Sequence, residues 1–150
     1  MGAQFSVTTG KLTLTTGATK SLILLNPVTN RFVITQISVS MDATAAAAGV
    51  QFDLYRVNSL GSPAGTAGVE NVLDPATQAA TTTGLTALST EPTTVFVLDS
   101  WYLQPLGGLL VVQYPLGREP VGAAAGSRVG LRYTTAAETP DCVATIWFEE

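Results

Sequence analysis

The chain of 150 residues contains no histidine and a single cysteine, Cys142. Without histidine the sequence lacks the commonest general base, the Ser-His-Asp triad and the usual zinc ligand. One cysteine cannot form an internal disulfide, and on an apolar strand face we expect Cys142 to be a buried, inert thiol. The eleven Asp and Glu residues are dispersed, and nothing singles out a glycosidase pair or a calcium loop among them. We therefore predict no enzyme activity, no cofactor and no metal site.

Charge is also scarce. Charged residues make up 12% of the chain, about half of the ~25% that is typical of soluble domains. The seven Lys and Arg residues are scattered singly and the net charge is −4, which argues against direct nucleic-acid binding. No apolar run approaches the ~20 residues of a membrane-spanning helix, and residues 1–5 lack the features of a signal peptide. We expect a protein made in a cytoplasm, with neither nucleic acid nor a membrane as its partner.

Neutral residues take the place of the missing charge, since 46% of the chain is apolar and Thr, Ser, Ala and Gly are abundant. Two interpretations are open. Much of the surface faces another protein, because the cores of protein interfaces are depleted of charge, or the chain is a monomer with a Thr-rich β-surface. We favour the first.

Short runs of alternating apolar and polar residues, separated by Gly, Pro and Asn, predict strands along the chain. The strands expected are 4–7, 11–15, 21–25, 31–41, 50–57, 128–134 and 142–148, together with the pair described below, into which residues 94–98 lead; residues 69–73 are a candidate for one further short strand. No fixed repeat is visible. We predict an all-β fold, an antiparallel β-sandwich of about 8–9 strands with a jelly roll as the preferred topology, in one domain over residues 1–150.

Two segments stand apart from this pattern. Residues 1–18 are light in apolar residues, and we expect an edge strand or an N-terminal arm that pairs with a neighbour. Residues 58–94 are broken by Gly and Pro and then become rich in Thr and Ala. A connection of this length inside a compact domain is usually functional or carries small elements of its own. We expect a long loop excursion that contacts a partner.

The segment from Trp101 to Glu119 reads as two apolar strands joined by a turn at residues 105–108, where two glycines supply the positive φ angles of a tight hairpin. In the second strand, residues 109, 111 and 113 point to one face, and residues 110, 112 and 114 to the other. Both faces are largely apolar. We predict that this strand is covered on both sides, in the core and at or beside a subunit interface. The predicted interface residues are Leu109, Val111, Tyr114, Arg118 and Glu119.

The C-terminal half carries a series of short motifs: Glu-Pro-Thr at 91–93, Ser-Trp at 100–101, Pro-x-Gly-Gly at 105–108, Pro-Leu-Gly-Arg-Glu at 115–119, Arg-Val-Gly-Leu-Arg at 128–132 and Trp-Phe-Glu-Glu at 147–150. Leu-Asp-Pro-Ala at 73–76 fits the same pattern. The chain in this respect resembles small virion proteins of tailed bacteriophages, in particular capsid decoration (cement) proteins. The resemblance implies a β-sandwich bound as a homotrimer to the capsid exterior, with the major capsid protein as partner. It supplies no catalytic residues.

Two functional hypotheses follow. The first is a structural virion protein, oligomeric and bound to a capsid lattice. The alternative is a carbohydrate- or receptor-binding β-sandwich module of a virion fibre, in which sugar rings stack on exposed aromatic side chains. The aromatic residues considered are Trp101, Tyr102, Tyr114 and Trp147. Because they lie in strands, we expect them to fill the core instead.

Overall fold

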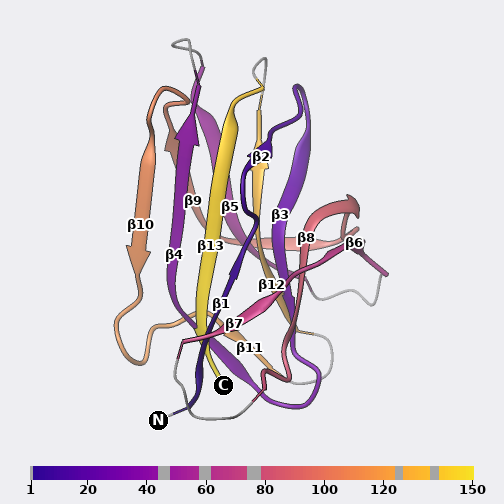
Figure 1. Ribbon diagram of the computed structural model, residues 1–150. Coiled ribbons are helices and arrows are strands. Elements are labelled where there is room, and N and C mark those ends of the chain that lie inside the picture. Colours follow the sequence, from indigo (N-terminus) through magenta and orange to yellow (C-terminus); the bar gives the residue numbers. More distant parts are fainter. Residues whose placement is uncertain (1, 44–47, 58–61, 74–78, 124–126, 136–138) are drawn as a thin grey trace.

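The computed structural model describes residues 2–43, 48–57, 62–73, 79–123, 127–135 and 139–150. All regular structure in these ranges is β-structure, in two antiparallel sheets that lie face to face (Figure 1). Nothing within the same ranges forms a helix of the length and apolarity needed to cross a membrane. The strands are β1 (Gln4–Thr8), β2 (Leu12–Thr13), β3 (Thr19–Asn26), β4 (Phe32–Asp42), β5 (Val50–Val57), β6 (Ala64–Ala67), β7 (Glu70–Val72), β8 (Thr83–Thr90), β9 (Val95–Leu103), β10 (Leu109–Gln113), β11 (Val121–Gly122), β12 (Arg128–Thr134) and β13 (Asp141–Glu149).

The first sheet has the strand order β10-β4-β13-β1-β7, with β11 paired to β4 and β2 to β13; the second has the order β6-β8-β3-β12-β5-β9. Eight strands form four antiparallel pairs in which the first strand of the chain pairs with the last, the second with the second-last, and so on. The pairs are β1 with β13, β3 with β12, β4 with β10 and β5 with β9. This first-with-last pairing is the strand order of a jelly roll. The predicted antiparallel β-sandwich is confirmed, and the additional short strands account for the larger number of elements.

The main core lies between the sheets, where the rings of Phe5 and Phe148 stack at 5.5 Å and Phe32 meets Phe148 edge-on at 5.8 Å. On β4 the buried residues are Phe32 and Ile34, followed by Ile37 and then every second residue to position 41. The register with β13 skips one residue between Ile34 and position 36, which marks a β-bulge. The extra residue at position 35 reverses the alternation of side chains along the strand. The apolar residues before the bulge (32 and 34) and those after it (37, 39 and 41) therefore all face the core.

The N-terminal residues 4–8, expected in an edge strand or an arm, form β1 between β13 and β7. Phe5 and Val7 have no exposed surface, so the backbone and side chains of this strand are used within the chain. The described part of the excursion over 58–94 contains β6, β7 and β8, and β8 pairs with β3. Leu88 of β8 joins Leu24 and Tyr55 in a second, smaller apolar cluster.

The predicted hairpin between the strands on either side of residues 105–108 is wrong. β9 pairs with β5 in the second sheet, whereas β10 pairs with β4 in the first sheet. The connection therefore crosses from one sheet to the other. Gly107 has a φ of 72°, and the Gly108 amide donates to the Gln104 carbonyl. The glycines form a tight turn, as expected. Such a turn can join two strands of one hairpin or two strands of different sheets, and here it joins different sheets.

Candidate functional site

Exposed hydrophobic side chains gather in one part of the molecule. Of thirteen large exposed hydrophobic residues among those that the structure describes, eight lie between positions 96 and 116. We call this the β9–β10 edge surface; its residues are Phe96, Val97, Leu98, Tyr102, Leu106, Leu109, Val111 and Leu116. β9 and β10 are the outermost strands of their sheets and lie on the same side of the sandwich, at the left of Figure 1.

The predicted interface residues fall into two groups. Leu109 and Val111 are 67% and 53% exposed on β10. The neighbouring Leu110 turns inward and packs against the main core. The prediction that this strand is buried in the core is therefore wrong, because β10 is an edge strand with one face covered. Tyr114, Arg118 and Glu119 instead lie between β10 and β11, where they line one groove.

Three rows of residues on the outer face of the first sheet carry no charge, whereas Asp42 and Asp141 pair at one end of the same face and Lys11 binds Asp141. Residues paired directly across strands point to the same face, and the register gives three rows that include Leu109 and Val111. The rows are Gln113–Gln36–Trp147–Ser6, Val111–Ser38–Thr145–Thr8 and Leu109–Ser40–Val143. Every member is apolar or a neutral hydroxyl or amide. The middle of this face is therefore neutral, and its β10 side, with Leu109 and Val111, is part of the β9–β10 edge surface.

A hollow of about 350 Å³ lies over this neutral face, around Trp147. Gln36 and Gln113 line it, and the Gln113 Nε2 donates to the Gln36 Oε1 at 2.9 Å. Gln4 and Tyr114 complete the polar part of the wall. A half-buried indole ring next to side-chain amides offers stacking together with neutral donors and acceptors.

A second hollow, an open groove of about 290 Å³, lies between β9 and the segment 114–121. Arg56 reaches it from β5, and its Nη2 donates to the Val121 carbonyl at 3.0 Å. The Arg56 Nε and the Tyr114 hydroxyl are buried with no hydrogen-bond partner among the described residues. Burial, with a smaller contribution from the charge of Asp99, raises the pKa of Tyr114 to about 12, so the hydroxyl keeps its proton and remains a donor.

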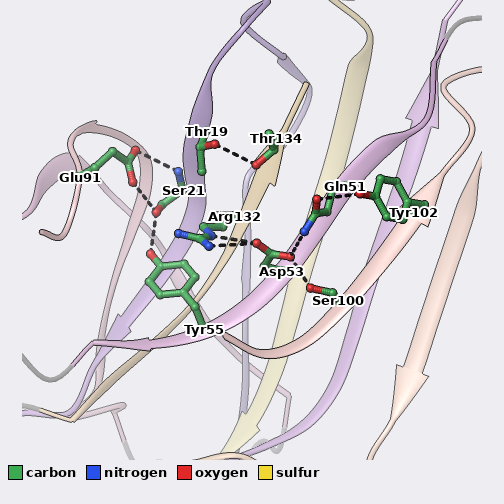
Figure 2. A network of polar contacts seen from close by, with 10 residues as sticks. All are labelled: Thr19, Ser21, Gln51, Asp53, Tyr55, Glu91, Ser100, Tyr102, Arg132 and Thr134. Atoms are coloured by element: carbon green, nitrogen blue, oxygen red, sulfur yellow. Dashed lines mark hydrogen bonds and ion pairs between the residues drawn. The ribbon is translucent and has the colours of Figure 1, made fainter. Parts of the chain in front are cut away.

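A network of polar contacts crosses the second sheet in one row (Figure 2). The register places Ser21, Arg132, Asp53 and Ser100 directly opposite one another on β3, β12, β5 and β9. Arg132 donates to Asp53 through Nε at 3.1 Å and forms an ion pair through Nη2 at 3.0 Å. Ser100 and Gln51 also donate to the Asp53 carboxylate. Burial alone would raise the pKa of Asp53, but these hydrogen bonds and the charge of Arg132 lower it.

The same network extends to Glu91 in the connection between β8 and β9 (Figure 2). Glu91 accepts hydrogen bonds from the Ser21 amide and hydroxyl. Since the Ser21 hydroxyl has only one proton, the Tyr55 hydroxyl is the donor in their 2.6 Å contact. All of these groups are engaged with one another across the sheet. The network therefore secures β9 and the preceding connection rather than presenting a nucleophile and its base.

Cys142 is 2% exposed, and burial together with Asp141 raises its pKa to about 12. The expected buried thiol is confirmed. The expectation that the aromatic side chains fill the core is wrong for Tyr102, which is 73% exposed and donates to the Gln51 amide oxygen. Trp101, Tyr114 and Trp147 are half-buried. Within the ranges that the structure describes, no cluster of three or more His, Cys, Asp or Glu residues has the geometry of a metal site.

Residues 56 and 106 belong to these surfaces and were not predicted from the sequence. Arg56 lies between the buried residues Tyr55 and Val57 in β5, and a charged residue in that position is the signal that could have identified it. Comparison with known proteins finds no family model that matches the chain and no curated protein with significant sequence similarity.

Proposed function

We propose that the chain is a structural virion protein that associates with copies of itself and binds a bacteriophage capsid as a decoration protein. The observation that carries the proposal is the concentration of eight exposed hydrophobic residues on the β9–β10 edge surface. Apolar side chains exposed on two adjacent edge strands mark an edge that another chain can cover.

Of the two edge strands, β10 lacks the usual protection against pairing with other chains, whereas β9 retains one charged residue and a bulge. Exposed edges are commonly guarded by charged side chains, proline or bulges. β10 has no charged residue, and β9 carries only Asp99 over nine positions, with a register shift next to it. A second copy of the chain covers these strands most simply, because the same surface is then buried on every copy. A trimer is the form that the resemblance favours.

The neutral outer face of the first sheet suits attachment to a capsid. A protein lattice offers a broad surface, and the uncharged part of this face over β4, β13 and β1, such as the row of Ser38, Thr145 and Thr8, can be desolvated at low cost. Weak contacts from each copy add together when an oligomer binds neighbouring capsid subunits. The major capsid protein on the outside of the particle is therefore the proposed partner.

Sedimentation of the purified chain, alone and with capsids, tests both parts. We expect an oligomer, with three times the monomer mass of 15.6 kDa for a trimer, that pellets with capsids. A monomer at every concentration that stays in the supernatant overturns the proposal. An oligomer that ignores capsids overturns the decoration role and leaves self-association standing.

The hollow around Trp147 favours a second candidate, a carbohydrate-binding module of a virion fibre. Its indole ring and the amides of Gln36 and Gln113 have the chemistry that recognises a neutral sugar. A glycan array distinguishes the two candidates. A ligand that quenches tryptophan fluorescence in the wild type but not in Trp147→Ala supports sugar binding, and an array without hits removes it.

A further inference from the structure

The open edge of β10 presents its main-chain amide and carbonyl groups in a fixed phase. At one end of the strand, the Met41 amide donates to the Gly108 carbonyl at 2.8 Å. At the other end, the Tyr114 amide donates to the Thr35 carbonyl at 3.0 Å. In an antiparallel ladder, bonds in these positions flank residue pairs that exchange no hydrogen bond with each other, and such pairs recur at every second residue. The residues of β10 in such pairs, whose amide and carbonyl groups therefore point away from β4, are 109, 111 and 113.

This edge is unguarded among the residues that the structure describes. β10 is the last strand of its sheet (Figure 1), so no described strand pairs with it on this side. Its sequence, Leu-Leu-Val-Val-Gln, has neither a charged residue nor a proline, and its register on β4 has no bulge. Charged residues, proline and bulges are the features that keep edge strands from pairing with other chains. The edge is therefore open to a further strand.

β10 is complementary to a second, antiparallel copy of itself. With Val111 opposite the same residue of the other copy, residue 109 lies opposite residue 113, and all outward positions of the two strands meet. Pairs of this kind exchange both of their hydrogen bonds, so every outward amide and carbonyl group is satisfied. A register shifted by one residue sets outward groups against inward ones, and a longer shift leaves outward positions unmatched. Since a twofold axis brings each residue near its own copy, the absence of charge in β10 also avoids repulsion.

Two exposed leucines lie symmetrically about the same position. Leu106 comes five residues before Val111, and Leu116 comes five residues after it. They are 57% and 96% exposed, and the second is the most exposed large hydrophobic residue that the structure describes. An antiparallel pair centred on Val111 places the turn that carries Leu106 in one copy beside the segment that carries Leu116 in the other. The twofold arrangement therefore gathers apolar side chains at both ends of the paired strands, where a single copy leaves them in water.

We propose that two copies of the chain pair through β10, antiparallel and about a twofold axis at Val111, so that their first sheets join into one continuous sheet. The inference rests on the proposed self-association and names its contact. A strand of another protein would also satisfy the open groups, but a second β10 accounts in addition for the matched register and for the leucines on either side of it. A twofold contact closes after two copies. The expected mass is therefore twice the monomer mass of 15.6 kDa, in place of the trimer that the resemblance favours.

Cysteine cross-linking tests the register of the pair. The native Cys142 is 2% exposed and does not compete for oxidation. In Val111→Cys the two thiols lie at the axis, on residues whose Cα atoms are about 5.5 Å apart, a separation that a disulfide can span. Mild oxidation should therefore give a covalent dimer. Leu109→Cys is the matched control, because its two thiols lie about 13 Å apart along the paired strands and should not cross-link.

Proline substitution tests the hydrogen bonds of the pair. Val111→Pro removes an amide that points to the open edge, a position at which edge strands tolerate proline. Sedimentation velocity should show association weakened by about tenfold or more. Folding is measured separately, by urea denaturation at a protein concentration below the dissociation constant of the wild-type dimer, and the variant should unfold cooperatively there. Leu110→Pro is the matched comparison, because it removes an amide that pairs with β4, and it should unfold at a clearly lower urea concentration.

The outcomes separate this inference from the proposed function. A dimer that cross-links through Val111→Cys and not through Leu109→Cys supports the inference. A wild-type trimer, or a dimer in which Val111→Cys does not cross-link, overturns it and leaves the proposed self-association standing. A Val111→Pro variant that associates like the wild type, or that does not fold, contradicts the assigned direction of the Val111 amide. A wild type that is monomeric at every concentration overturns both the inference and the proposed function.

Discussion

Replacing Leu109 with Asp separates folding from assembly. Leu109 is 67% exposed on an edge strand, so the folded chain loses little packing when the side chain is changed. The low β-propensity of Asp limits the expected destabilisation to about 1 kcal/mol. Replacing a leucine that is buried in the core would lower the unfolding free energy several times as much and would prevent folding. The first expected result is therefore a soluble and folded Leu109→Asp variant.

The effect on assembly should be larger. Full burial of a leucine contributes about 1.5–3 kcal/mol, and two-thirds of the Leu109 side chain remains open for a partner to cover. Each copy therefore loses about 1–2 kcal/mol of association free energy, which weakens binding by about 5- to 30-fold. The desolvation of a buried carboxylate adds to this loss.

Sedimentation velocity and urea denaturation on the same samples measure both quantities. Val69→Asp is the matched control, because Val69 is 72% exposed outside the β9–β10 edge surface. It should assemble like the wild type. An unfolded Leu109→Asp variant would show that β10 is not an edge strand, and one that assembles normally would show that Leu109 is not in the interface.

Asp53→Ala should lower the unfolding free energy by about 3 kcal/mol, because Arg132 loses its carboxylate partner, and thermal denaturation should show a melting temperature about 6–12 °C lower. Since the pKa of Asp53 is lowered on folding, its contribution is present above the unfolded pKa of about 4 and is lost as the pH falls through the lower folded value. The stability difference between wild type and Asp53→Asn should thus be constant from about pH 5 to 8 and shrink below about pH 4, and a difference that persists at about pH 2 contradicts this assignment. Cys142, buried and with its pKa raised to about 12, should react with iodoacetamide at about pH 8 only in denaturant, as mass spectrometry can check. Gly122→Ala should destabilise the fold by about 1–3 kcal/mol in urea denaturation, because a Cβ there would lie 2.2 Å from Phe32; an unaffected variant would show that the ring can move aside.

The sandwich could be predicted because alternation is a local property of the chain. Strands such as β12 and β13 place apolar residues at every second position, and their mutual burial follows from that pattern. The pattern also survives the bulge in β4, where the extra residue at Thr35 exchanges the two faces. β8 was harder to predict, because its Thr- and Ala-rich sequence resembles a loop and acquires its strand conformation by pairing with β3.

The pairing of β9 and β10 could not be predicted, because it depends on which sheet each strand joins. The apolar residues on both faces of β10 do not distinguish a strand in the core from one at an open edge. Leu109 and Val111 are exposed on that edge, and their place at an interface stays a prediction. Arg56 and Tyr114 come to line one groove only when β5 and the segment after β10 fold together, and no sequence spacing connects them.

The most direct test of the proposed function is a cryo-electron microscopy reconstruction of the phage particle that is proposed to carry this chain. The account predicts jelly-roll density in symmetric groups on the outside of the capsid, with the β9–β10 edge surface buried between copies and the neutral face of the first sheet against the major capsid protein. Particles without this density, or copies that bury a different face and leave β9 and β10 open to solvent, would contradict it.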